Sequence, residues 1–142
     1  MGPDHERVLE RLGASFSKYG EVDVAYLFGS RTRGEAAQES DWDFAILLSR
    51  SFGDPYDLVR LIGDLEHVLG VGDREVNLVV LNDANLALSH RVVSEGIIVF
   101  ERDVERRVGF EVRVLKLYMD FKPVLDQMRK ALIEEYTHGQ AQ

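Results

Sequence analysis

The sequence predicts one α/β domain that ends in a long helical segment. Two observations carry this prediction. Apolar residues at helical spacing alternate along the chain with short aliphatic runs that end at glycine or polar residues, which is typical of helices alternating with buried strands. The chain has 142 residues, of which 45% are hydrophobic and 30% are charged, the composition of an ordinary globular domain with its own core. No internal repeat, linker or low-complexity block divides it.

The first third of the chain predicts one helix and two strands. Pro3 begins an amphipathic helix, and Gly20 lies where its C-terminal cap would be. Residues 22–28 (VDVAYLF) form a buried strand that ends at Gly29, and residues 41–48 (DWDFAILL) form a second strand. Strand side chains alternate between the two faces, so the second strand carries two sets of side chains, one of which consists entirely of core residues. The core set is Trp42, Phe44, Ile46 and Leu48, and the opposite set is Asp41, Asp43, Ala45 and Leu47.

The middle of the chain predicts two more helices and two more strands. Asp54 is placed to cap a helix whose first residue is Pro55 and whose apolar stripe ends at Gly70. The elements that follow are a third strand over residues 75–81, a capped helix from about Asp83 to Glu95 and a short strand over residues 96–100.

A long helical segment closes the chain. Asp103 is placed to cap it, it runs to about Tyr136, and Pro123 is expected to break or kink it. Its apolar residues exceed what one narrow core stripe requires: Leu115, Leu117, Tyr118, Phe121, Val124, Leu125, Met128 and Leu132. Core packing is the favoured role of each single residue, and contact with a partner is the alternative.

Charge and composition exclude several kinds of site. The chain has 17 basic and 25 acidic residues, a net charge of −8, which argues against general nucleic-acid binding but leaves room for a local basic pocket. It has no cysteine, and its four histidines lie far apart, so an oxygen-ligated cation is favoured over zinc. We find no membrane-spanning run and no signal-peptide core in MGPDHER, so we expect a cytoplasmic protein with no membrane and no direct nucleic-acid contact.

Residues suited to chemistry concentrate between the first two predicted strands, in GSRTRG from residue 29 and SDWD from residue 40. Gly29 and Ser30 directly follow a strand, where the backbone can approach an anion and offer N–H donors. Asp41 and Asp43 lie two apart on one strand, with α-carbons roughly 6.6 Å apart, so their carboxylates can converge on the same cation. Mg²⁺ is commonly held by a few carboxylates and by substrate phosphates. The segment therefore predicts a phosphate site beside a magnesium site, and the alternative is a solvated surface turn.

These residues resemble the nucleotidyltransferase superfamily that includes DNA polymerase beta, whose motif is Gly-Ser, a spacer of about ten residues and Asp-x-Asp. The spacer here runs from Arg31 to Ser40. The form is similar to the minimal nucleotidyltransferases (MNT), which carry G-S-x-A/T-R-G and S-D-x-D, and HRVVSEGIIVFERD and LYMDFKPVL extend the resemblance over nearly all of the chain. It implies a nucleotidyltransferase fold with helices packed on a small mixed sheet. It also implies one minimal domain over residues 1–142, with a core of about 1–101 and a helical segment of about 103–137.

MNT proteins are commonly antitoxins paired with a HEPN-domain ribonuclease. The resemblance therefore implies transfer of AMP from ATP to a tyrosine hydroxyl of a HEPN-domain toxin, with Mg²⁺ as cofactor and a hetero-oligomer with the toxin. Matched by position, Asp41 and Asp43 hold magnesium, and Gly29 and Ser30 hold the triphosphate. Arg33 is assigned to a further phosphate contact or to ordering of the loop. The neighbouring Arg31 is either a phosphate contact or a solvated loop cation.

One position departs from the family pattern. Members provide a third carboxylate on a neighbouring strand, in a pattern like V-D-L-V-x-L, and this chain has Asn77 at that catalytic position. An amide can coordinate a metal through its carbonyl, but it brings no charge and cannot act as a general base. Glu75 lies on the same strand face, where a solvent-facing side chain is favoured over a substitute for the missing carboxylate. We expect Asn77 to weaken the binding of the catalytic ion more than that of the nucleotide-bound ion.

Three functions remain open on the sequence alone. The first is a magnesium-dependent adenylyltransferase acting as an antitoxin. The second is a catalytically weakened or inactive nucleotidyltransferase-fold antitoxin that neutralises its partner by binding, which Asn77 favours. The third is nucleotide transfer to a small-molecule hydroxyl, the least favoured because the chain lacks the extra domain that would enclose such a substrate.

Overall fold

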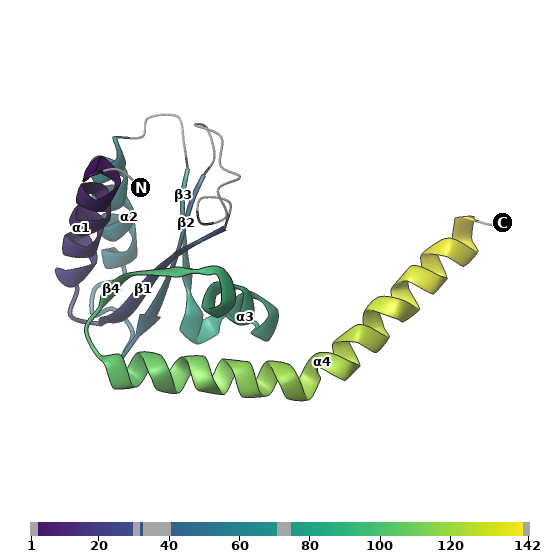
Figure 1. The fold of residues 1–142 in the computed structure, drawn as a ribbon. Coiled ribbons are helices and arrows are strands. Elements are labelled where there is room, and N and C mark those ends of the chain that lie inside the picture. Colours follow the sequence, from purple (N-terminus) through teal and green to yellow (C-terminus); the bar gives the residue numbers. More distant parts are fainter. Residues whose placement is uncertain (1–2, 30–31, 33–40, 71–74, 141–142) are drawn as a thin grey trace.

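The computed structural model describes residues 3–29, 32, 41–70 and 75–140 and places a four-stranded sheet between two groups of helices (Figure 1). The strands are β1 (Val22–Phe28), β2 (Trp42–Leu48), β3 (Val76–Val80) and β4 (Ile97–Glu101). Their order across the sheet is β3-β2-β1-β4. Strand β1 is antiparallel to β2 and β4, and β2 is parallel to β3. The sheet is therefore mixed, as the resemblance implied.

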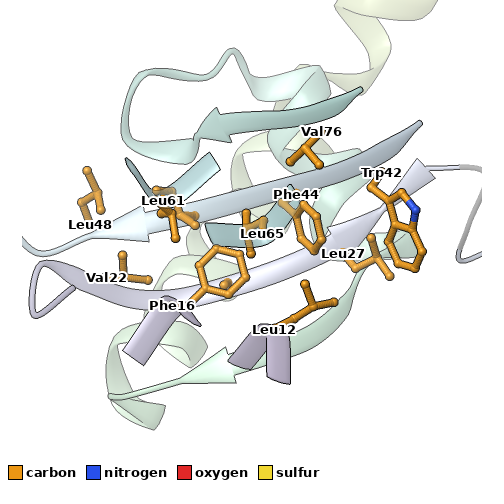
Figure 2. Close-up of a cluster of buried hydrophobic side chains, with 12 residues drawn as sticks. Leu12, Phe16, Val22, Leu27, Trp42, Phe44, Leu48, Leu61, Leu65 and Val76 are labelled. Atoms are coloured by element: carbon orange, nitrogen blue, oxygen red, sulfur yellow. The ribbon is translucent and has the colours of Figure 1, made fainter. Parts of the chain in front are cut away.

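Helices α1 (Pro3–Ser17) and α2 (Asp57–Leu69) cover one face of this sheet. Figure 2 shows the core that they enclose, in which Leu12, Phe16, Leu61 and Leu65 from the helices meet Val22, Leu27, Trp42, Phe44, Leu48 and Val76 from the strands. The rings of Phe16 and Phe44 pack edge to face with centroids 5.7 Å apart. The core set predicted for the second strand is confirmed, because all four of its side chains are buried here.

Helix α3 (Leu86–Glu95) and the first part of α4 (Val104–Gln140) cover the opposite face. The cluster buried there consists of Val24, Tyr26 and Phe28 of β1, Ala45 and Leu47 of β2, Leu81 and Val92, with Phe110 of α4 packed against it. Ala45 and Leu47, which share the opposite face of β2 with Asp43, are buried in this second cluster. Helices therefore cover β2 on both faces.

A polar cluster fastens α4 to the sheet. The Tyr26 hydroxyl donates a hydrogen bond of 2.8 Å to Glu111 Oε1. Arg107 forms ion pairs with Glu111 at 3.1 Å and with Glu101 of β4 at 3.2 Å. Burial, followed by the hydrogen bond to the Glu111 carboxylate, raises the pKa of Tyr26 well above its ordinary value. These contacts fix the direction in which α4 leaves the sheet.

The second helix begins later than the sequence predicted. Its expected first residue was Pro55, whereas α2 begins at Asp57. Asp54 does not cap it, because its Oδ1 accepts a hydrogen bond of 2.9 Å from the backbone N–H of Tyr56 and so closes a turn ahead of the helix.

The third helix also begins later than predicted. Asp83 belongs to a short 3₁₀ turn, η2 (Leu81–Asp83), and α3 starts at Leu86. Asn85 is the capping residue, since its Oδ1 accepts a hydrogen bond of 2.8 Å from the backbone N–H of Leu88.

Helix α4 is longer than predicted and spans 37 residues, continuing through Pro123 without a break. The predicted cap is confirmed, because Asp103 Oδ1 accepts a hydrogen bond of 3.0 Å from the N–H of Arg106. The helix bends about midway, and its second half extends away from the sheet (Figure 1). The expected core packing of its apolar residues is wrong for those that are exposed: Leu115, Leu117, Phe121, Val124, Met128 and Leu132. None of the described helices combines the length and apolar character that crossing a membrane requires.

Candidate active site

The site lies at the edge of the sheet where β1 ends and where β2 and β3 begin. Strand β1 runs against β2, and β3 runs with it, so the end of the first strand meets the starts of the other two. Asp43 is the Cα partner of Phe28 on one side and of Asn77 on the other. The register thus brings Asp43 and Asn77 together, as the predicted site required, and places Gly29 beside them.

Gly29 permits a close approach between the end of β1 and the Asp43 carboxylate. Its φ of 84° lies in the left-handed region, which favours glycine. A Cβ atom on Gly29 would lie 2.5 Å from Asp43 Oδ2, a distance that real side chains do not reach. Thr32 closes the turn that follows, because its N–H and its hydroxyl donate to the carbonyl of Gly29 at 3.1 and 2.7 Å. The backbone conformation therefore favours glycine, and a side chain at this position would displace the Asp43 carboxylate.

The remaining residues of the predicted phosphate site, Ser30, Arg31 and Arg33, lie outside the described residues, so their roles stay predictions. Asp41 directly precedes β2 and is exposed, while Asp43 lies within β2 and is half-buried.

Asn77 contacts Asp43 directly. Its side-chain Nδ2 donates a hydrogen bond of 3.0 Å to Asp43 Oδ1. The side chain at position 77 therefore occupies one oxygen of the Asp43 carboxylate with an amide donor. Glu75 lies immediately before β3, with an exposed side chain and a carbonyl that accepts from the N–H of Trp42 at 3.1 Å. The solvent-facing interpretation of Glu75 thus agrees with its exposure.

Helix α3 adds a cation that sequence analysis did not assign to the site. The guanidinium carbon of Arg91 lies 5.7 Å from the centroid of the Phe28 ring, and Phe28 both precedes Gly29 and pairs with Asp43. Arg91 also forms an ion pair of 3.5 Å with Glu95. The strand that follows α3 returns beside β1, and this topology brings Arg91 to the edge. The sequence shows only that Arg91 follows a histidine on a helix.

The donor atoms at this edge fit a hard divalent cation. Asp41 and Asp43 offer carboxylate oxygens, and Mg²⁺ accepts one or two carboxylates when substrate phosphates complete its ligands. Within the part of the chain that the structure describes, no three His, Cys, Asp or Glu side chains form a cluster able to hold a metal ion.

A mixed sheet covered by helices, with Gly-Ser ending one strand and Asp-x-Asp beginning its neighbour, defines the fold and site of a nucleotidyltransferase. Residues 10–105 match the family model described as Polymerase beta, Nucleotidyltransferase. The chain belongs to this nucleotidyltransferase family, which confirms the superfamily that its motifs indicated.

Similar proteins include MNT proteins. The chain is 27% identical over 114 residues to the protein adenylyltransferase MntA of Aphanizomenon flos-aquae (strain 2012/KM1/D3), which covers 76% of each protein. It matches a chain of a crystal structure of a toxin–antitoxin with AMP-PNP with a TM-score of 0.69 and 25% identity, over 91% of this chain and 98% of that one. It also matches a structure of a tri-AMPylated Shewanella oneidensis HEPN toxin in complex with MNT antitoxin, with a TM-score of 0.66 and 22% identity, over 93% and 98% of the two chains.

Proposed function

We propose that this chain is an antitoxin that acts as a protein adenylyltransferase and moves AMP from ATP to a tyrosine hydroxyl of a HEPN-domain toxin. The observation that carries the proposal is the close approach of Gly29 to Asp43, which joins the Gly-Ser and Asp-x-Asp motifs at one edge of the sheet. The relatives supply the substrate classes, because they include a protein adenylyltransferase and antitoxins solved with AMP-PNP or with an AMPylated toxin. A complex with the toxin in the cytoplasm is part of this proposal.

The nucleotide binds at the end of β1. Gly29 has no side chain to keep the triphosphate away, and the N–H and hydroxyl groups of Ser30 offer donors to it. Arg33 supplies a further positive charge in the loop. Arg91 approaches the same edge from α3, where its charge adds to the attraction for phosphate.

Asp41 and Asp43 are the proposed magnesium ligands. Mg²⁺ held by these two carboxylates would supply positive charge beside the triphosphate, where negative charge develops as pyrophosphate leaves. The hydrogen bond from Asn77 holds the carboxylate of Asp43 in one orientation, with Oδ2 directed at Gly29. This orientation keeps the carboxylate at the end of β1, where the phosphates are expected.

Adenylyl transfer requires a proton to leave the acceptor. The tyrosine oxygen forms a bond to the α-phosphorus of ATP, the bond from that phosphorus to the pyrophosphate oxygen breaks, and the hydroxyl proton is released. A carboxylate at position 77 could accept this proton, whereas the amide of Asn77 cannot. The proton therefore passes to solvent, and we expect slower transfer than with a third carboxylate.

The test is the intact mass of the candidate HEPN-domain partner after incubation with the chain, ATP and MgCl₂. We expect a gain of one or more AMP units with wild type and none with the Asp41→Asn, Asp43→Asn double variant. Asp54→Asn is a matched control, because Asp54 is an aspartate of the turn ahead of α2, away from the site. No gain with wild type, despite a folded chain, would contradict the transferase proposal.

A second candidate function is neutralisation by binding alone, and the Asn77 amide beside Asp43 favours it. An antitoxin of this kind need not bind ATP, whereas the enzyme must. Magnesium-dependent ATP binding, measured by calorimetry, separates the two. A stable complex that silences the toxin equally well with wild type and with the Asp41→Asn, Asp43→Asn variant would support the binding function.

A further inference from the structure

An apolar stripe runs along α4 from the part packed on the sheet into the part that extends beyond it. It consists of Val114, Tyr118, Phe121, Leu125, Met128 and Leu132, and the intervals between successive members alternate between four and three residues. This spacing keeps all six side chains on one face of a helix, and the alternation of four and three residues is typical of a helix packed against another helix.

The first members of this stripe pack against the rest of the molecule. Val114 is buried, and the ring of Tyr118 stacks on that of His90 in α3 with centroids 3.5 Å apart. Beyond them the same face becomes accessible to solvent: the exposed fraction is 51% for Phe121, 58% for Met128 and 64% for Leu132. Within the described chain, only the first part of the stripe is therefore covered by other elements.

A groove marks the point where α4 leaves α3. It has a volume of about 410 Å³ and is lined by Asn85, Leu86, Ala87, Phe121 and Leu125. Its lining is almost entirely apolar, and Phe121 and Leu125 belong to the stripe. An apolar side chain from another protein could fill this groove while its neighbours contact Met128 and Leu132. The groove and the stripe thus form one continuous surface.

The charges beside the stripe indicate what kind of helix it fits. Lys122 and Arg129 flank one edge of it, seven residues or about two helical turns apart, whereas Val124 and Ala131 flank the other. In an antiparallel pair of two copies, Lys122 and Arg129 would face their own counterparts, and in a parallel pair they would face Val124 and Ala131. Neither arrangement of two copies supplies an opposite charge, so the edge is suited to a partner helix with acidic side chains.

Helix α4, which contains the stripe, packs on the same face of the sheet as the Asp43 side chain. Asp43 shares one face of β2 with Ala45 and Leu47, and these two residues are buried in the cluster against which Phe110 of α4 packs. A protein docked along α4 would therefore approach the sheet face to which Asp43 belongs. The relatives solved in toxin–antitoxin structures match at least 91% of this chain, which includes most of α4.

We propose that Phe121, Leu125, Met128 and Leu132, together with the groove at Leu86 and Ala87, form the docking surface for a helix of the acceptor protein, and that acidic side chains of that helix pair with Lys122 and Arg129. The inference rests on the proposed function for the identity of the partner. In this arrangement the projecting half of α4 binds the partner, and the edge of the sheet at Gly29 and Asp43 carries out the transfer.

The test measures binding between the full chain and the candidate HEPN-domain partner, without ATP and without magnesium. We expect the Met128→Asp, Leu132→Asp double variant to raise the dissociation constant by at least about a hundredfold, because it places two charges in an apolar contact. The matched control is Ile133→Asp. Ile133 is 59% exposed and adjoins Leu132 in sequence but points to another side of the helix, so we expect its affinity to stay within about threefold of wild type.

A charge-reversal variant tests the acidic partner. Lys122→Glu with Arg129→Glu is expected to weaken binding by about tenfold at low salt, and by less at high salt. The side chains of Met128 and Leu132 are exposed, so thermal unfolding of the double variant should match that of wild type. A loss of binding by a variant that unfolds normally cannot be ascribed to misfolding.

Three outcomes would overturn the inference. The first is that wild type does not bind the partner, and the second is that the Met128→Asp, Leu132→Asp variant binds it as tightly as wild type does. The third is that the isolated wild-type chain forms a dimer whereas this variant is a monomer. The proposed function fails separately, if the wild-type complex forms and depends on Met128 and Leu132 but yields no gain of AMP on the partner. In that case the docking surface stands and the transferase does not.

Discussion

The side-chain amide of Asn77 donates a hydrogen bond of 3.0 Å to Asp43 Oδ1 across the parallel pair of β2 and β3. In the family pattern this position holds a carboxylate, which would place a second negative charge beside Asp43. Two adjacent carboxylates repel each other until a cation lies between them. We therefore expect Asn77 to remove that repulsion and, with it, part of the attraction for the cation. The metal-free site should then be more stable, and the cation should bind more weakly.

Replacing Asn77 with Asp should reverse both effects, on the stability of the metal-free protein and on the affinity for the cation. We expect Asn77→Asp to lower the free energy of unfolding by about 1 to 4 kcal/mol in EDTA, because two like charges then lie side by side. Added MgCl₂ should restore much of this loss in the variant and do little in wild type. Thermal unfolding with and without MgCl₂ measures both effects.

The same variant should transfer AMP faster. A carboxylate at position 77 can accept the proton of the acceptor hydroxyl, so we expect the single-turnover rate of Asn77→Asp to rise by at least about tenfold at saturating magnesium. Asn77→Ser, which offers no carboxylate, is the control and should not accelerate transfer. An unchanged rate in a folded Asn77→Asp variant would count against a catalytic role for this position.

Gly29 should not tolerate a side chain. Gly29→Ala places a Cβ atom 2.5 Å from Asp43 Oδ2 at a φ of 84°, so either the carboxylate or the backbone must move. We expect a loss of about 1 to 3 kcal/mol in the free energy of unfolding, together with loss of AMP transfer. Gly63→Ala is the matched control: Gly63 lies within α2 with nothing near its Cβ position, and alanine there should stabilise the fold by about 0.5 to 1 kcal/mol. Equal stability of the two variants would show that the approach to Asp43 imposes no constraint.

Arg91 should contribute to binding of the nucleotide. Its guanidinium lies over Phe28 at the end of β1, so Arg91→Ala is expected to raise the dissociation constant for ATP with magnesium by about fivefold and to leave the fold intact. Arg91→Lys keeps the charge and should recover part of the affinity. Calorimetry with both variants measures this, and equal affinity of Arg91→Ala and wild type would exclude Arg91 from the site.

The strands and the motif residues could be predicted from local sequence, but the contacts among them could not. The run at residues 22–28 is confirmed residue for residue as β1, because a buried aliphatic strand that ends at glycine is a strong local signal. The approach of Asn77 to Asp43 depends on which strands are neighbours, and the position of Arg91 depends on the return of β4 beside β1. Both are properties of topology, which no single segment contains.

The apolar residues of α4 show a different limit. Their spacing is the same whether a face is buried in the domain or prepared for another protein, so the pattern alone favoured core packing for Phe121 and Leu132. The direction of α4 decides between the two roles, and that direction is set far away, where Tyr26 and Arg107 join the helix to the sheet. Exposure of this face is therefore a consequence of contacts near the start of the helix.

The contact of Tyr26 with Glu111 should make stability depend on alkaline pH. Burial and the hydrogen bond raise the folded-state pKa of Tyr26 above its ordinary value of 10.0, so its contribution is fully present below about pH 10 and is lost as the pH rises further. Burial and a hydrogen bond to Asp64 raise the pKa of Tyr19 to about 12, which adds to the decline between pH 10 and pH 12. Each tyrosine contributes a slope of up to about 1.4 kcal/mol per pH unit in this range.

Tyr26→Phe should remove the contribution of Tyr26 to the loss of stability above pH 10. We expect the variant to lose about 1 to 2 kcal/mol of unfolding free energy at pH 8, where the hydrogen bond to Glu111 is missing, and to decline less steeply than wild type above pH 10. The control is Tyr56→Phe, since Tyr56 is exposed and its removal should leave both the stability and the slope unchanged. Urea unfolding between pH 8 and pH 11 measures the curves. Parallel curves for wild type and Tyr26→Phe would mean that the hydroxyl of Tyr26 does not fasten α4 to the sheet, because only a proton held more tightly in the folded state produces a difference in slope.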